Sequence, residues 1–142
     1  NVLINRKIIS STNNGLKIIF CIGETLMEKK KKHTKKVLKK QIMTGLQKVK
    51  KLKNILFAYE PVWSIGTGII PKNHELENNV EFIKNNLKRN FKIKNPIVLY
   101  GGSVSPKNIN KLKIVSSIDG FLIGGASQKS KKFIDIVKKT FN

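Results

Sequence analysis

The sequence predicts an α/β fold built on a parallel β-sheet, and two features of its 142 residues favour that class. First, four apolar runs, at residues 16–23, 55–62, 96–102 and 120–125, are continuous rather than alternating. Continuous runs are typical of strands in parallel sheets that are covered on both faces. Second, amphipathic helical patterns separate the runs, and strands that alternate with helices form right-handed βαβ units.

The two longest helices are predicted from apolar side chains at helical spacing. One stripe consists of Leu38, Ile42, Leu46 and Val49, and the other of Leu76, Val80, Ile83 and Leu87. Asn73, two residues after Pro71, is the expected N-cap of the second helix.

Three shorter helices complete the pattern. The first begins near residue 2 and is expected to stop at Asn14-Gly15. Another opens at "SPKNINKL", with Ser105 as its cap and Pro106 in its first turn. Phe133, Ile136 and Val137 mark the last helix. The chain therefore consists of a helix and four strand–helix units, with no linker between domains. Because it starts with Asn and with a helix, we expect an N-terminal portion to be missing.

The composition is that of a globular protein, with 39% hydrophobic and 26% charged residues and a formal charge of +21. Such a charge raises the alternative of a nucleic-acid-binding module. However, the lysines are spread along the chain, and aromatic residues that would stack on bases are scarce. Lys, Ile and Asn are all abundant and all have A/T-rich codons, so a biased genome explains the excess. The densest run, "EKKKKHTKK" at 28–36, is expected to cover a solvated helical face.

No apolar run in the sequence is near the roughly 20 residues that a membrane helix needs, and no signal peptide is visible in these residues. Its single cysteine, Cys21, excludes an internal disulfide, which suits a reducing compartment. Because Cys21 lies within "KIIFCIG", we expect a buried core thiol rather than a nucleophile.

Small and polar residues gather where the predicted strands end, in "IGE", "YEPVW", "YGGS" and "IGGAS". Ligand sites of parallel α/β proteins form at this edge of the sheet. The glycine pairs 101–102 and 124–125 each precede a helix start, where backbone N–H groups can approach an anion. Each pair on its own also suits a tight turn. Two such pairs on consecutive strands favour a phosphate site.

Glu60 is the only carboxylate within its predicted strand, and it stands at the strand's end. A buried glutamate needs a partner or a task, so the alternatives are an ion pair with a lysine and a general base. The following residues 61–63 are stiff, whereas Gly66, Thr67 and Gly68 form a small tip. Stiff ends around a flexible tip are typical of a lid that closes as a unit.

Four ordered motifs closely resemble the triosephosphate isomerase family: "CIGETL" (21–26), "AYEPVWSIGTG" (58–68), "YGGSV" (100–104) and "DGFLIGGAS" (119–127). The resemblance implies a TIM (β/α)8 barrel, of which residues 1–142 are the C-terminal four βα units of a single domain. It also implies an isomerase that interconverts dihydroxyacetone phosphate and glyceraldehyde 3-phosphate in glycolysis and gluconeogenesis. Such an enzyme is expected to be cytoplasmic, to need no metal or cofactor, and to act as a homodimer when complete.

The resemblance also assigns roles to individual residues. Glu60 matches the base that moves a proton through an enediolate. The residues that match the phosphate site are Gly66, Ser103, Gly124 and Gly125, with Leu122 lining the pocket. The lid and its supports match Pro61, Val62, Trp63, Ile65, Thr67, Gly68, Glu24 and Tyr100. Trp63 is the hinge aromatic, while Glu24 and Tyr100 brace the open and the closed lid respectively.

The chain also departs from the family pattern. The family's early Asn-x-Lys loop and its catalytic histidine are absent, and neither His33 nor His74 follows a predicted strand. The chain alone is therefore expected to be inactive. An unusual hinge at residues 69–71 puts the lid kinetics in question. The alternatives are another phosphate-binding barrel isomerase, a free-standing half-barrel that binds phosphate without turnover, and the nucleic-acid module.

Overall fold

The computed structural model describes residues 2–141 and contains a four-stranded parallel sheet in the order β1-β2-β3-β4. The strands are β1 (Ile18–Ile22), β2 (Ile55–Tyr59), β3 (Val98–Tyr100) and β4 (Gly120–Phe121). One row of partners crosses the whole sheet, from Cys21 through Ala58 and Leu99 to Gly120. The parallel α/β prediction is confirmed. Each strand is shorter than its apolar run: all four lose residues at the carboxyl end of the run, and β1 and β3 also lose residues at the amino end.

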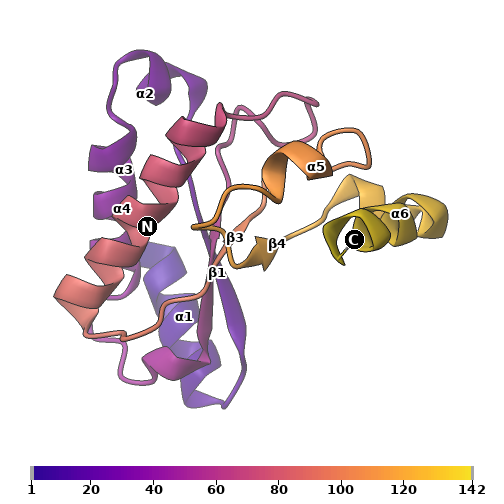
Figure 1. Cartoon of the computed structure of the whole chain (residues 1–142). Helices are drawn as coiled ribbons and strands as arrows, with labels where there is room; N and C mark the ends of the chain where they lie inside the picture. The colour runs from indigo at the N-terminus through magenta and orange to yellow at the C-terminus, as the bar shows by residue number, and fades with distance from the viewer. Residues whose placement is uncertain (1, 142) are drawn as a thin grey trace.

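The helices lie in the predicted order, except that two helices rather than one separate β1 from β2 (Figure 1). They are α1 (Val2–Asn13), α2 (Leu26–Lys30), α3 (Thr34–Gly45), α4 (Asn73–Phe91), α5 (Ile109–Leu112) and α6 (Ser130–Phe141), with 3-10 turns η1 (Leu52–Asn54) and η2 (Gly125–Gln128). Helices α1, α3 and α4 form a layer on one side of the sheet, whereas α5 and α6 lie beyond β4. None of the helices in residues 2–141 is long and apolar enough to cross a membrane.

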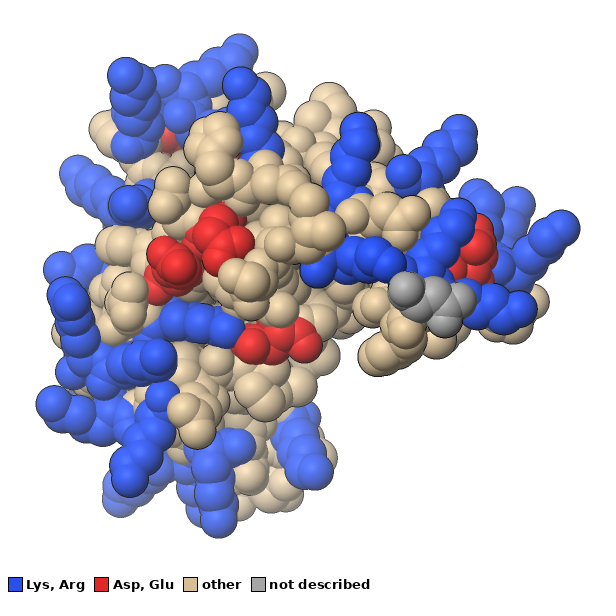
Figure 2. Space-filling view, in the orientation of Figure 1, with Lys and Arg blue, Asp and Glu red and all other residues tan. Residues whose placement is uncertain are grey.

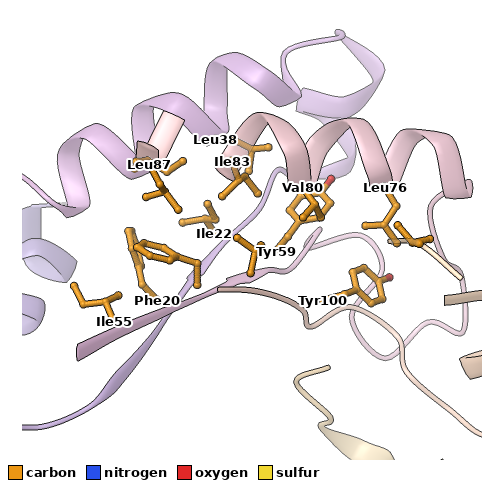
Figure 3. Packing of buried hydrophobic residues seen from close by; sticks show 14 of the residues in the cluster. Phe20, Ile22, Leu38, Ile55, Tyr59, Leu76, Val80, Ile83, Leu87 and Tyr100 are labelled. Atoms are coloured by element: carbon orange, nitrogen blue, oxygen red, sulfur yellow. The ribbon is translucent and has the colours of Figure 1, made fainter. Parts of the chain in front are cut away.

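The core lies between this helical layer and the sheet. The predicted α4 stripe of Leu76, Val80, Ile83 and Leu87 is fully buried, and its side chains point at the strands (Figure 3). Each such side chain stabilises the fold by about 1.5–3 kcal/mol relative to an exposed position. The α3 stripe is confirmed for Leu38, Ile42 and Leu46, while Val49 lies beyond the helix and is half-buried. The last predicted helix is confirmed as α6, and of the three residues that marked it Ile136 is buried while Phe133 and Val137 are exposed.

Within residues 2–141, the prediction of a sheet covered on both faces is wrong at β1, although residues 57–59 in β2 are all buried. Side chains in β1 alternate, so that Phe20 and Ile22 are buried beneath the helices while Ile19 and Cys21 are exposed on the opposite face. The expected buried core thiol is therefore also wrong. A continuous apolar run does not reveal which of its two faces is covered, and the described residues place helices on only one of them.

The end of α1 is confirmed. The helix stops at Asn13, and Gly15 takes a left-handed conformation with φ of 78°. The Leu16 N–H then donates to the Ser11 carbonyl at 3.0 Å, which satisfies one of the last carbonyls of the helix.

Three local expectations are wrong in detail. The lysine run is not one helical face, because α2 ends at Lys30 and a turn with Lys32 at φ 58° precedes α3. Asn73 is the first residue of α4 rather than its cap, and its amide donates to the Lys111 carbonyl across to α5 at 3.1 Å. Ser105 begins a turn, and the cap of the four-residue α5 is Asn108.

Candidate active site

Glu60 directly follows β2 and is half-buried at the carboxyl edge of the sheet. Its N–H donates to the Ile22 carbonyl at 2.8 Å, which ties the loop to β1. Gly101, at the end of β3, lies against the carboxylate, and a Cβ at that position would sit 2.5 Å from Glu60 Oε1. A Cβ at Gly23 would likewise collide with the Glu60 carbonyl. Glycines at the ends of both neighbouring strands therefore make room for Glu60.

Glu60 is not held by an ion pair among the described residues, where the lysines that pair with carboxylates are Lys29, Lys84 and Lys139. The structural ion pair considered for it is therefore absent from residues 2–141. The neighbouring group whose pKa Glu60 changes is the Cys21 thiol. Partial burial, together with the hydrogen bond and negative charge of Glu60, raises the pKa of the Cys21 thiol to about 12. The thiol is therefore protonated at neutral pH and unsuited to nucleophilic work.

The base of the predicted lid is anchored on Glu24, whose side chain is completely buried. Trp63 Nε1 donates to Glu24 Oε1 at 2.8 Å, and the Tyr59 hydroxyl donates to Oε2 at 3.1 Å. Asn79 in turn donates to the Tyr59 oxygen at 3.0 Å. Burial raises the pKa of Tyr59 above its ordinary value, and the charge of Glu24 adds to this, so the phenol remains a donor.

Ser64 connects the lid to the loop after β3. Its buried Oγ donates to the Ile69 carbonyl at 2.6 Å, lies 2.9 Å from the Tyr100 hydroxyl and accepts from the Ser103 N–H at 3.2 Å. A Cβ at Gly102 would collide with the Tyr100 hydroxyl and lie 2.7 Å from the Ser64 oxygen, so a glycine is required at this contact.

The tip of the lid reaches the same loop. Gly66 and Gly68 both have left-handed backbones, with φ of 72° and 80°, and the Gly68 N–H donates to Ser103 Oγ at 3.2 Å. Thr67 Oγ1 donates to the Ser64 carbonyl at 3.0 Å and accepts from the Ile69 N–H at 3.1 Å, which closes the tip on itself. The lid residues Val62, Ile65 and Ile69 are exposed, while Pro61 is buried. The resemblance assigned Glu24 to the open lid and Tyr100 to the closed lid. In this structure the Trp63–Glu24 and Ser64–Tyr100 contacts are both present.

Three of the predicted phosphate ligands meet in one hollow. Gly66 from the lid, Ser103 from the loop after β3 and Gly125 from η2 line a cavity of about 520 Å³. Gly124 precedes η2, and its carbonyl accepts from the Ser127 N–H at 2.9 Å. Leu122 is half-buried and is tied to β3 by a hydrogen bond from its N–H to the Tyr100 carbonyl at 2.9 Å. Neither of the last two lines this cavity.

The structure also shows site residues that the sequence reasoning missed. Ser64 is a small polar residue within the quoted lid motif, and nothing in its spacing marks it as buried. Asn79 could have been found, because it lies three residues after Leu76 on the apolar stripe of α4. Lys29 lies 3.8 Å from the centre of the Trp63 ring and pairs with Glu75 at 2.8 Å, an arrangement that joins α2, the lid and α4.

The site contains a carboxylate and a hollow with room for an anion. Residues 2–141 hold no cluster of three His, Cys, Asp or Glu side chains that could bind a metal. On the face seen in Figure 2, lysine and arginine side chains lie mostly around the edge of the molecule.

A model of the triosephosphate isomerase family matches residues 1–140. A triosephosphate isomerase of Thermodesulfovibrio yellowstonii is 41% identical over 138 residues, which cover 96% of this chain and 56% of that protein. One of Leptospira biflexa is 41% identical over 141 residues, covering 94% and 57% respectively. One of Mycoplasmopsis pulmonis is 41% identical over 142 residues, covering 100% and 54%. The chain thus spans little more than half the length of the curated relatives it matches.

Proposed function

Because the chain belongs to the triosephosphate isomerase family, we propose that it supplies the C-terminal four βα units of a barrel enzyme with that activity. The enzyme would interconvert dihydroxyacetone phosphate and glyceraldehyde 3-phosphate, a step of glycolysis and gluconeogenesis, and would act as a cytoplasmic homodimer. In this proposal Glu60 is the base that moves a proton between the two carbons next to the carbonyl.

One observation carries the proposal: Glu60 and the hollow at Gly66, Ser103 and Gly125 belong to neighbouring loops at the same edge of the sheet. Phosphate held by backbone N–H groups and a serine hydroxyl would fix the triose relative to the carboxylate. Such positioning replaces a bimolecular encounter by a step within one complex. Glycines at positions 23 and 101 leave the space that the Glu60 carbonyl and carboxylate occupy.

The lid has the role of excluding water in this proposal. Hydrogen bonds from Trp63 to Glu24 and from Gly68 to Ser103 hold its base and its tip over the site. Closure strengthens the electrostatic interactions of the enediolate and prevents its side reactions. Gly124 and Leu122 would complete the phosphate site beside the residues that line the hollow.

Abstraction of a proton next to a carbonyl produces negative charge on oxygen, which requires donors or a cation. Neither histidine of the chain follows a strand, since His33 precedes α3 and His74 lies in the first turn of α4. We propose that a lysine and a histidine from four preceding βα units supply these groups in a complete barrel. The 142-residue chain by itself would then bind phosphate but would not turn over substrate.

Isomerase activity of the complete native protein tests the proposal. We expect Glu60→Gln to lower kcat by about a thousandfold, because general-base catalysis contributes roughly 10²–10⁴, with little change in phosphate affinity. Glu81→Gln, at an exposed position on α4, is the matched control and should leave kcat unchanged. Equal activity in both variants would contradict the assignment of Glu60.

Two further readouts separate the alternatives. Exchange of substrate hydrogens with deuterated solvent should accompany turnover, whereas phosphate binding without exchange would indicate the half-barrel alternative. The intact mass of the native protein should be near roughly 27 kDa for a barrel of about 250 residues. A mass of 16.1 kDa, that of this chain, would require a second polypeptide to complete the enzyme.

A further inference from the structure

Resting on the phosphate site proposed above, we propose that its hollow continues into a lysine-lined groove. The two together would bind anions that carry two linked phosphate groups. The groove belongs to α6 and the loop before α5, outside the residues assigned to the isomerase site.

The geometry of two adjoining hollows supports the proposal. The cavity at Ser103 and Gly125 has a volume of about 520 Å³, far more than one phosphate group fills, since a water molecule occupies roughly 30 Å³. A second hollow of about 710 Å³ lies along α6. Pro106 and Lys132 line both. A ligand seated in the first hollow can therefore extend past Lys132 into the second.

The groove carries a positive charge that the described residues do not neutralise. Lys107 and Lys132 line the first hollow, and Lys131 and Lys138 line the second with Lys132. The one carboxylate in the lining, Asp135, is already paired with Lys139 at 3.0 Å. An incoming anion therefore meets several exposed ammonium groups, and the only carboxylate among the residues that line the two hollows is the paired Asp135.

The position of two of these lysines on α6 also favours anion binding. Lys131 and Lys132 lie in the first turn of a 12-residue helix that has no acidic residue there. The N-terminus of a helix carries partial positive charge and favours anions, so cations at this end are held against the field of the helix. A bound phosphate group would offset both the lysine charges and the helix pole.

In the resulting mode of binding, the first phosphate group accepts hydrogen bonds from Ser103 and the backbone at Gly125. The second group lies by Lys132, with Lys107 at the mouth of the hollow. Lysine ammonium groups act as flexible point charges, so the groove selects for charge rather than for the shape of the group that joins the two phosphates. Diphosphates and short bisphosphates are the ligand class.

Titration calorimetry of the complete native protein at fixed ionic strength tests the groove, with inorganic phosphate and pyrophosphate as probes. We expect pyrophosphate to bind about tenfold tighter than phosphate, since each exposed ion pair contributes up to roughly fivefold. The double variant Lys107→Gln/Lys132→Gln should reduce this preference to about twofold or less. The control Lys36→Gln/Lys40→Gln removes the same charge from exposed positions on α3 and should retain it.

The proposal that the groove binds a second phosphate group is overturned if pyrophosphate binds no tighter than phosphate in the unmodified protein. It is also overturned if the two double variants show the same preference. Ser103→Ala, measured with inorganic phosphate, tests the site of the proposed function separately. Unchanged phosphate binding in that variant would overturn the proposed phosphate site, whereas an unchanged pyrophosphate preference in the lysine variant overturns only the groove.

Discussion

Trp63 Nε1 donates a 2.8 Å hydrogen bond to Oε1 of Glu24, so the base of the lid is fastened to a carboxylate that is fully buried. Glu24 follows β1 and Trp63 follows β2, and these two strands pair in register over residues 18–22 and 55–59. The strand pairing thus brings the carboxylate and the indole together. Glu24 forms no ion pair within the described residues. Its carboxylate is instead stabilised by hydrogen bonds from Trp63 and Tyr59.

We expect Trp63→Phe to lower the free energy of unfolding by about 1–3 kcal/mol, because it leaves a buried carboxylate with one donor fewer. Urea denaturation of the variant and the parent protein measures the change. Val62→Thr, at an exposed neighbouring lid position, is the control and should shift stability by less than about 0.5 kcal/mol. If the two variants were equally stable, the Glu24 anchor would have no energetic role.

Ser64 and Tyr100 are expected to act as a coupled pair. Their oxygens lie 2.9 Å apart, and Ser64 also contacts the Ile69 carbonyl and the Ser103 N–H. A double-mutant cycle with Ser64→Ala and Tyr100→Phe should give a coupling energy of about 0.5–3 kcal/mol in urea unfolding. Additive effects would mean that lid and loop are stabilised independently.

Gly101→Ala is expected to destabilise the fold by about 1–3 kcal/mol, because its Cβ would lie 2.5 Å from Glu60 Oε1 and overpacking forces side chains out of place. Gly124→Ala is the matched comparison: no atom lies within 4 Å of a Cβ at that position, and its φ is −88°. Thermal unfolding should show a lower midpoint for the first variant and a nearly unchanged one for the second. The opposite order would contradict the packing of Gly101 on Glu60.

Much of the fold could be predicted because the local signals agree with the tertiary structure. The α4 stripe is both helical in period and fully buried, and Gly15 takes the left-handed backbone that ends α1. Cys21 could not be placed, since an apolar run is the same whichever face of a strand is covered. The cap of α5 was missed because Asn108 lies three residues beyond Ser105, and its Oδ1 accepts from the Ser105 N–H at 2.8 Å.

The residues that the structure brings together at the hollow come from the long family motifs, whereas residues whose contacts are set by the tertiary structure were missed. Gly66, Ser103 and Gly125 come together because three loops follow adjacent strands. Ser64 gains its role from the Tyr100 hydroxyl, 36 residues away, and no periodicity in the sequence records such a contact. Nothing in the sequence distinguishes Lys29 from the other lysines, and only the tertiary structure shows its contact with the Trp63 ring.

The Cys21 thiol should react slowly with iodoacetamide although it is exposed. Its pKa is raised from 9.0 to about 12, first by desolvation and then by Glu60, so little thiolate exists at pH 8. We expect alkylation of the folded protein at pH 8 to be at least about tenfold slower than that of the urea-unfolded protein. The folded rate should keep rising with pH toward 12.

Two further results follow from the same raised pKa of Cys21. The stability that this group contributes is complete below pH 9 and is lost as the pH rises through about 12, because the unfolded thiol ionises first. Glu60→Gln removes a negative charge that holds the proton on the sulfur, so alkylation at pH 8 should accelerate relative to the parent protein. Glu81→Gln, on the exposed face of α4, should leave the rate unchanged. Equal rates in all three proteins would show that Glu60 does not act on the thiol, and its position beside Cys21 would need revision.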